Sequence, residues 1–387
     1  MHYRDSIFAS LLKPISRRQF QSIVARHKGD AYDKDFDSWD HLVALIYAQL
    51  SAADSLRGLV ASWNANAHHH YHLGSARIAR STLADANRRR PPEVFADTFA
   101  LLSGLAGRQL RRDGKEMLRL IDATPIPLGA LCGWAKSNGR THGLKMHTVF
   151  DPHADHPRRI SITASTVNDV VVGREEPLEA GATYVFDKAY CDYGWWSRMH
   201  EAGAFFVTRP KTNARYEIVR EREVVQTQGD GFVVLADAEV RLVTQGKTKL
   251  TCPMRRLRIQ RENGQVLEVV SNDLRRSAVD IAALYKARWQ IELLFRWLKQ
   301  HLKLSRFLGR SENAIRLQIL AAMIAFLLLR LAAKTSRSTL PALRFAELVG
   351  QCLFTRKPMH RLDKPPEVNP SKPRPKYAPE QLGLAYA

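Results

Sequence analysis

Apolar residues in the first part of the chain recur every three or four positions, the spacing of helices that bury one face. The pattern includes Phe20 and Ile23 and runs to about residue 63. It continues to about residue 112, where Ser81 is placed to cap a helix and Pro91 to end it. We therefore expect an all-helical N-terminal domain over residues 1–75 and a helical linker over residues 76–112.

After Gly114 the pattern changes to short apolar runs that are typical of β-strands. The runs cover residues 117–124, 144–150, 159–164, 184–187 and 204–208, and a helical segment lies at 193–201. A second β-rich stretch follows Pro210, with turn signals such as Asn263-Gly264 and short runs at 232–235, 240–243 and 257–259. This order predicts an α/β core that begins over residues 113–209 and is interrupted by a β-rich insertion over residues 210–275.

Helical spacing returns at Ser277, which forms a capping-box pattern with Asp280. The longest apolar run, from Ile319 to Leu329, spans 11 residues. A membrane-spanning helix needs roughly 20, so this run predicts a buried core helix. Residues 276–335 would complete the core, and residues 336–387 would form a C-terminal region with a tail rich in Pro and Lys.

The net charge of the chain narrows the classes of molecule that it is expected to bind. The chain has 387 residues, with 59 Lys and Arg against 38 Asp and Glu, a formal charge of +21 and a pI near 10.1. Such an excess favours a polyanionic partner, with nucleic acid first. A host whose proteins are generally basic, or an anionic membrane surface, remains an alternative at this point. The arginines around the helices of the 76–112 linker suit contact with a DNA backbone.

Four scattered cysteines contain no CxxC pair, which argues against a zinc ribbon or a disulfide scaffold. The N-terminus lacks the charged start and apolar segment of a signal peptide. We therefore expect a cytoplasmic protein, associated with the nucleoid if the partner is DNA.

The segment from Tyr285 to Lys299 carries the clearest chemical pattern. Tyr285, Arg288, Glu292 and Lys299 are three, four and seven positions apart. In one continuous α-helix these four side chains fall within a stripe of roughly 60°. One helix face would then hold a carboxylate beside Arg, Lys and Tyr side chains, which are suited to binding phosphate.

Two further acids end apolar runs that are typical of buried strands. These are Asp122, in Leu-Ile-Asp, and Asp187, in Val-Phe-Asp. Either acid alone could be an ordinary turn former or helix cap. A buried carboxylate costs free energy unless it is paired or binds a metal. Asp122, Asp187 and Glu292 together therefore suggest a two-metal site for phosphoryl transfer.

The motif Y-x2-R-x3-E-x6-K, with Asp122 in Ile-Asp-Ala-Thr and Asp187 in Val-Phe-Asp-Lys-Ala-Tyr, resembles the DDE transposases of bacterial insertion sequences in the YREK group. The resemblance implies an RNase H-like catalytic core interrupted by the β-rich insertion and preceded by the helical domain. It also implies that Asp122, Asp187 and Glu292 bind two Mg²⁺ ions, for which Mn²⁺ can substitute. Tyr285, Arg288 and Lys299 would contact phosphates at the DNA end.

Members of this group cut both transposon ends through hairpin intermediates and join them to a target. The resemblance therefore implies transposon terminal inverted repeats and target DNA as partners, and a homodimer that bridges both ends. Two alternatives remain: an RNase H-like nuclease or resolvase without strand transfer, and a catalytically silent, domesticated DNA-binding protein.

Other basic residues are secondary candidates for DNA contact. Lys188 stands where many relatives have Arg, and Lys211 lies at the junction of core and insertion. Arg255, Arg256 and Arg258 are expected on a DNA-facing strand of the insertion, with an ordinary solvated face as the alternative. The insertion has no Trp to stack a flipped base, although Tyr216 or Phe232 could substitute. We expect Trp195 and Trp196 in the core.

Overall fold

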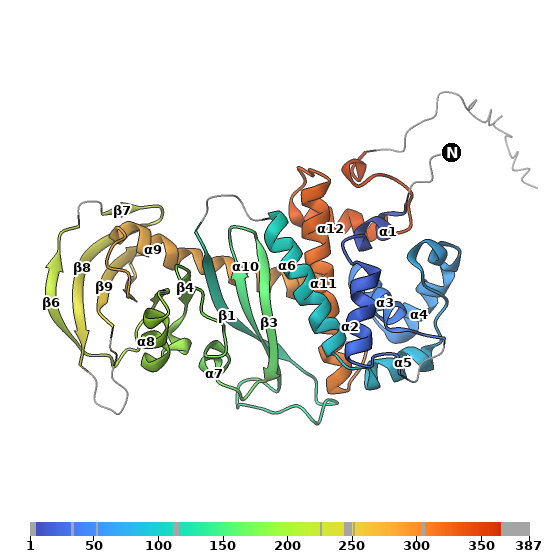
Figure 1. Cartoon of the computed structure of the whole chain (residues 1–387), viewed down its shortest axis with the longest axis horizontal. Helices are drawn as coiled ribbons and strands as arrows, with labels where there is room; N and C mark the ends of the chain where they lie inside the picture. The colour runs from blue at the N-terminus through green and yellow to red at the C-terminus, as the bar shows by residue number, and fades with distance from the viewer. Residues whose placement is uncertain are drawn as a thin grey trace, which may run out of the picture.

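The protein is described by a computed structural model that covers residues 5–31, 35–51, 53–110, 116–224, 227–243, 250, 252–302 and 306–364. The molecule is elongated, with a large sheet at one end and the N-terminal helices at the other (Figure 1). Helices α6 and α11 stand between these two ends. The tail from residue 365 onward lies outside the described residues.

The N-terminal region is helical, as its apolar spacing predicts. Its elements are α1 (Ile7–Leu12), α2 (Arg17–Arg26), α3 (Ser38–Leu50), α4 (Leu56–Ala65), the 3₁₀ turn η1 (Ala67–Leu73), α5 (Arg80–Arg89) and α6 (Glu93–Leu110). Ser81 was expected to cap a helix, but it lies inside α5, whose cap position is Ala79. Because Ala79 is the last residue with extended backbone, the helix begins before Ser81 can act as a cap.

The core sheet is mixed. Strands β1 (Leu118–Pro127), β2 (Gly143–Asp151) and β3 (His156–Ala164) pair antiparallel, and β4 (Thr183–Phe186) and β5 (Phe205–Thr208) add parallel strands beyond β1. The order is therefore β3-β2-β1-β4-β5. Between the strands lie α7 (Asp169–Gly173), the short turn η2 (Lys188–Tyr190) and α8 (Tyr193–Glu201).

The insertion extends this sheet. It contains β6 (Tyr216–Arg222), β7 (Gln228–Gly229), β8 (Phe232–Leu242), β9 (Met254–Arg261) and β10 (Val266–Ser271). Because β10 pairs antiparallel with β5, the order continues as β5-β10-β9-β8-β6. The runs 232–235 and 240–243, expected as separate strands, are one strand: β8 passes through both, and a register shift between Val234 and Ala236 takes up the irregularity.

The C-terminal elements are α9 (Ala278–Ala287), α10 (Trp289–His301), α11 (Glu312–Thr335), α12 (Ala342–Gln351) and the turn η3 (Met359–Arg361). The single helix expected through Tyr285 and Lys299 is in fact two helices that meet at Arg288. Here the backbone tightens: the N–H of Arg288 donates to the carbonyl of Tyr285, three residues back, and the N–H of Ile291 donates to that of Arg288.

The apolar core covers both faces of the sheet. One cluster joins the N-terminal helices, α11, α10 and one sheet face, and a second lies under α8 on the other face. Helix α11 is apolar and long enough to cross a membrane, but most of it is buried within the protein, as expected for a core helix. Trp195 and Trp196 are also buried in the core, as predicted.

Candidate active site

Two of the three candidate acids lie on neighbouring parallel strands. Asp122 is in β1, and Asp187 directly follows β4. The register pairs Ile121 with Phe186, so each acid comes one position after a paired residue. The hydroxyl of Thr208, at the end of β5, donates to the carbonyl of Asp187 at 3.2 Å. The two carboxylates therefore lie side by side at the edge where the parallel pairing of β1 and β4 ends, although β1 itself continues to Pro127 beside β2.

Helix α10 packs against β1 and brings the third acid to this edge. The Arg288 guanidinium lies between two carboxylates: its Nη1 is 3.4 Å from Asp122 Oδ2 and its Nη2 is 2.6 Å from Glu292 Oε1. The fold thus brings Arg288 against Asp122, a residue 166 positions earlier in the sequence. The break between α9 and α10 falls at this same arginine.

Burial makes Asp122 and Asp187 costly to ionise. Burial raises the pKa of Asp122 to about 7, and repulsion from Asp187 and Glu292 adds to the shift, whereas the Ala123 N–H and Arg288 oppose it. Burial also raises the pKa of Asp187, against the Ala189 N–H, which donates to its carboxylate at 2.8 Å. Clustered carboxylates in a partly dry site are stabilised by added positive charge.

The donor chemistry fits a hard divalent cation, since the carboxylate oxygens of Asp122 in β1, Asp187 after β4 and Glu292 in α10 are the kind of ligand that Mg²⁺ prefers. In the described part of the chain, no three His, Cys, Asp or Glu side chains are close enough together to hold an ion as they stand. Arg288 supplies the positive charge between Asp122 and Glu292. Asp122, Asp187 and Glu292 are the residues that could hold a metal here.

The three residues expected to bind phosphate differ in exposure. Tyr285 is buried, which raises its pKa, and the Arg288 guanidinium lies 5.8 Å from the centre of its ring. Lys299 is partly buried, and this burial lowers its pKa. Tyr285 therefore packs beneath Arg288, while Arg288 and Lys299 offer positive charge along α10.

The secondary candidates for DNA contact differ in how exposed their side chains are. Lys188, at the start of η2, and Lys211, between β5 and β6, are exposed, as is Arg258 on β9. Arg256 is partly exposed; it pairs with Glu268 and lies over the Tyr216 ring.

Arg255 does not lie on a DNA-facing surface, and that expectation is wrong. Its side chain is 2% exposed and binds Asp237 through two contacts, at 2.7 and 2.5 Å. On β9 it points to the same side as the buried residues Leu257 and Ile259, because successive side chains of a strand alternate between faces. Arg256 and Arg258 point to the other side.

Two residues near the acids, Lys145 and His147, had escaped sequence reasoning. Lys145, on β2, donates to Asp169 Oδ1 at 2.8 Å, and Asp169 in turn raises the pKa of Asp187. His147, on β2, pairs with Ala123, the residue that follows Asp122 in β1. Burial lowers the pKa of His147 to about 4. The register identifies Lys145 and His147, and it could not be read from the sequence.

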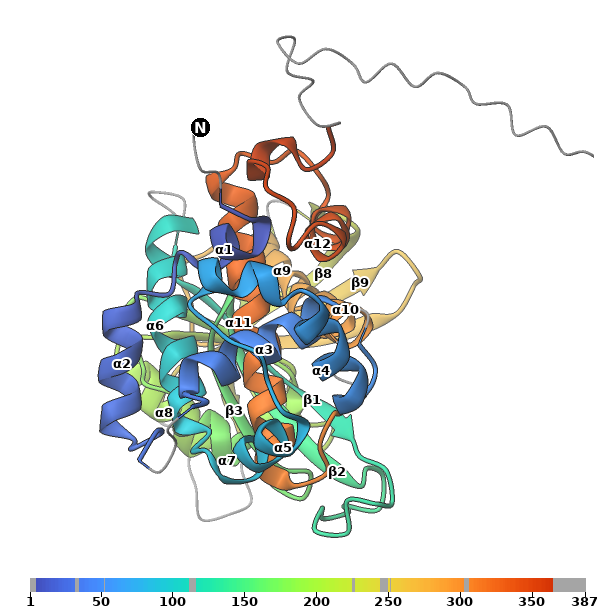
Figure 2. The ribbon, with the colours of Figure 1, turned by 90° about the vertical axis from the view of Figure 1, so that its right-hand side faces the viewer.

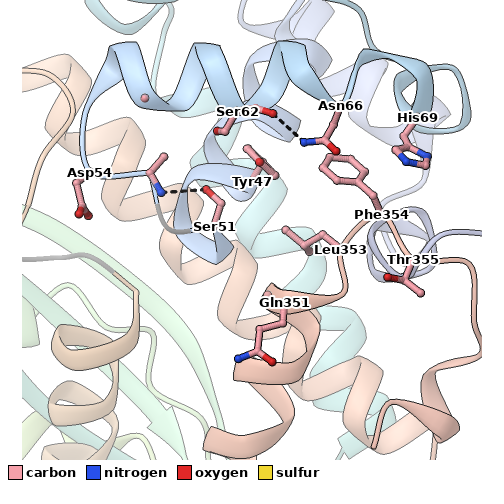
Figure 3. A pocket seen from close by; sticks show the side chains of 13 residues that line it. Tyr47, Ser51, Asp54, Ser62, Asn66, His69, Gln351, Leu353, Phe354 and Thr355 are labelled. Carbon is pink, nitrogen blue, oxygen red and sulfur yellow. Dashed lines mark hydrogen bonds between the residues drawn. The ribbon is translucent and has the colours of Figure 1, made fainter. Parts of the chain in front are cut away.

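A cavity of about 760 Å³ lies away from this edge, between α3, α4 and the segment after α12 (Figure 3). Tyr47, Asn66, His69 and Phe354 are among its lining residues, and none of the candidate acids lines it. The rings of His69 and Phe354 stack at 5.2 Å. The cavity belongs to the seam between the N-terminal helices and the C-terminal segment.

Comparison with known proteins agrees with the geometry. Residues 113–328 match the family described as transposase DDE domain, and residues 3–76 match a domain of unknown function. A putative transposase of Sinorhizobium fredii is 58% identical over 304 residues, which cover 79% of this chain and 85% of that protein. A probable insertion-sequence transposase of Geobacillus stearothermophilus is 30% identical over 290 residues, covering 74% and 76%.

A cryo-EM structure of the piggyBac transposase synaptic complex with hairpin DNA is similar with a TM-score of 0.44 and 10% identity, over 94% of this chain and 81% of that one. The mixed sheet, the helical N-terminal region and the matched family agree with the expected RNase H-like fold. By its matched domain and its relatives, the chain belongs to the DDE transposases of bacterial insertion sequences.

Proposed function

We propose that this transposase belongs to the YREK group and moves its element by cut and paste, through hairpin intermediates. Asp122, Asp187 and Glu292 hold two Mg²⁺ ions, or Mn²⁺ in their place. The observation that carries the proposal is the convergence of Asp122 and Glu292 on Arg288, beside Asp187, from two strands and a helix.

When bound, the two ions activate the attacking oxygen and stabilise the leaving one. The protein supplies the rest. The pairing of β1 with β4 fixes Asp122 and Asp187 relative to each other, and α10 sets Glu292 opposite them. The Arg288 guanidinium, which pairs with Asp122 and Glu292, has the paired N–H donors that suit a DNA phosphate. Tyr285 packs beneath that guanidinium and holds it in place.

Lys299 and Lys188 flank the site on separate elements. Lys299 lies on α10 two helical turns beyond Glu292, and Lys188 follows Asp187 directly. We assign Lys299 and Arg288 to the tightly bent DNA of the hairpin, where closely spaced phosphates need the most positive charge. Lys188, Lys211, Arg256 and Arg258 contact flanking DNA.

The partners are the terminal inverted repeats of the element and the target DNA. Two ends must be cut and joined in a coordinated way, so the working form is a homodimer that holds both. The reaction takes place on chromosomal DNA in the cytoplasm, at the nucleoid.

The test is cleavage of a labelled duplex that ends in the element's own terminal repeat, with Mg²⁺, on a denaturing gel. We expect nicked and hairpin-sized products with the natural protein and none with Glu292→Ala, although both proteins bind the duplex equally. Arg288→Lys and Lys299→Ala should reduce the hairpin more than the first nick. The matched control is Arg344→Ala, at an exposed arginine on α12, away from the catalytic helix.

Each result has a distinct meaning. Nicks without hairpins, or cleaved ends that never join a supercoiled target, would refute the cut-and-paste proposal and favour a nuclease. Equal binding with no cleavage by either protein would favour a silent DNA-binding copy. Equal loss of every step in Lys299→Ala would contradict its assignment to the hairpin.

A further inference from the structure

The loop between β1 and β2, residues 128–142, leaves the core sheet directly after the strand that carries Asp122. It contains Lys136 and Arg140, both exposed, and no Asp or Glu. It projects from the body of the molecule in both views (Figures 1 and 2). A basic projection next to a catalytic strand is in a position to contact the substrate.

This loop is held in one conformation by contacts at its base. Cys132 and Ala135 are buried in the main apolar cluster. The Leu128 N–H donates to the His142 carbonyl at 2.9 Å, and the Asn138 side chain donates to the Ser165 carbonyl at 2.9 Å. Side chains that point outward from the loop are therefore presented at a fixed place relative to β1.

Leu131 is one such side chain. It is 70% exposed, and among the large apolar residues in the described ranges only Tyr71 is more exposed. A single exposed Leu is common on protein surfaces. This one, however, lies on an anchored loop between Gly129 and Gly133, and a Cβ added at either glycine would meet no atom within 4 Å. The loop surface on both sides of Leu131 is therefore open.

A second basic segment lies against the loop. We call residues 306–311, between α10 and α11, the connector. The Trp134 indole N–H donates to the carbonyl of Arg310 at 2.7 Å, which fixes the loop to the connector. Arg306 and Arg310 are exposed, and the connector also lacks Asp and Glu. Arg306 lies 3.5 Å from Asp54, but both side chains are well exposed, so this pair is weak and solvent-screened.

Loop and connector thus present four cations, Lys136, Arg140, Arg306 and Arg310, on two segments that are joined through Trp134. The loop follows the strand of Asp122, and the connector follows the helix of Glu292 and Lys299. The surface is therefore linked to the candidate active site through the two elements that build it.

We propose that the loop and the connector form a second DNA-binding surface, for the duplex beside the cleaved phosphate. In this proposal the Leu131 side chain is a wedge that enters one base step, between two adjacent base pairs. The four cations bind phosphates, which gives affinity without sequence preference. An apolar wedge on a rigid support unstacks one step and bends the duplex, as minor-groove wedges do. The inference rests on the proposed function, because it assumes that the carboxylates act on DNA held at this edge.

The first test measures affinity for a duplex of arbitrary sequence by fluorescence anisotropy, with full-length protein and EDTA, over a series of salt concentrations. The affinity falls as salt rises, and each lost phosphate contact should make the slope of log K against log salt about 0.9 less negative. Replacing all four cations with Ala should therefore reduce the magnitude of the slope by about 3 to 4. A matched control removes Arg18, Arg26, Arg198 and Arg344, which are exposed on α2, α8 and α12.

The control should reduce the magnitude of the slope much less. Lys at the three arginine positions should restore most of the slope, which separates lost charge from lost folding. An unchanged slope in the four-alanine variant would overturn the proposal, as would an equal loss in the control. Binding of an acidic peptide in place of DNA would assign the surface to a protein partner.

The second test places 2-aminopurine at successive positions of a duplex ending in the terminal repeat. The natural protein should raise the fluorescence at one base step, and Leu131→Ala should abolish that rise while leaving affinity within a factor of a few. Leu343→Ala, at an exposed Leu on α12, is the control. No rise at any position, or an equal rise in Leu131→Ala, would overturn the wedge.

Both tests run without metal, so they do not depend on cleavage. If Glu292→Ala binds and unstacks DNA as the natural protein does, the surface stands whether or not the carboxylates cut. If cleavage succeeds and the salt slope does not change, the proposed function survives and this inference fails.

Discussion

The buried pair of Arg255 and Asp237 offers the sharpest test of the fold. We consider Asp237→Ala, which removes the carboxylate and leaves the arginine inside the insertion. Both side chains are 2% exposed. Asp237 accepts from Arg255 Nε at 2.7 Å and from Nη2 at 2.5 Å. Nη1 donates to the carbonyl of Arg276 at 2.6 Å, which links the strand to the start of α9.

The expected cost follows from this geometry. Removing one partner of a buried, hydrogen-bonded ion pair leaves an uncompensated charge and typically costs about 3–5 kcal/mol. Asp237 also lies 3.7 Å from the partly exposed Arg222, so a second cation loses a weaker contact. By contrast, Glu268→Ala breaks the partly exposed pair with Arg256, which should cost at most about 1 kcal/mol.

The assay is urea unfolding of the full-length protein, followed by circular dichroism and by tryptophan fluorescence. We expect Asp237→Ala to lower the apparent free energy of unfolding by about 3 kcal/mol or more. Replacing the pair with apolar residues of similar volume, as in Arg255→Met with Asp237→Leu, should recover much of that loss because no buried charge remains. A loss below about 1 kcal/mol, or one equal to that of Glu268→Ala, would refute the assignment of Arg255 as a structural residue.

Two further predictions concern residues around β2. Burial lowers the pKa of His147 to about 4, against the attraction of Asp169. The folded state therefore binds a proton at His147 less readily than the unfolded chain does. The contribution of this group to the free energy of unfolding is at its full value above about pH 6.5 and falls as the pH drops toward 4, by up to about 3 kcal/mol. His147→Gln should lose less stability than the natural protein between pH 7 and pH 4.5 in urea unfolding; parallel losses would contradict the burial argument. Gly143 has φ +155°, and a Cβ there would lie 2.2 Å from the Ile126 carbonyl oxygen. Gly143→Ala should therefore destabilise by about 2 kcal/mol or more, whereas Gly129→Ala, with open space around it, should change stability by under about 1 kcal/mol in the same assay.

Features that depend on neighbouring residues were predictable from the sequence. The helix expected at 193–201 has those bounds as α8. The Ser277 hydroxyl accepts from the Asp280 N–H at 3.0 Å, as the capping-box spacing predicts. Helix caps and apolar periodicity act over a single turn, so the residues themselves contain the information.

Features that depend on contacts between distant segments of the chain were not predictable from the sequence. The spacing of Tyr285, Arg288 and Glu292 assumed one continuous helix, and the structure breaks it at Arg288. Nothing in the insertion's sequence showed that β10 would join β5 and extend the core sheet. Strand pairing links segments far apart in the chain, and local patterns do not specify the partner.

The sequence by itself determined the chemistry available to this transposase: three widely separated acids, a basic helix around one of them, and a large positive charge. The tertiary structure alone decided which of these groups meet. It set Arg288 between Asp122 and Glu292, buried Arg255 against Asp237, and left Arg258 on the surface. The physical reason is that a side chain's type fixes what it can bind, whereas its burial and its partners depend on which strand face or helix face the fold turns inward.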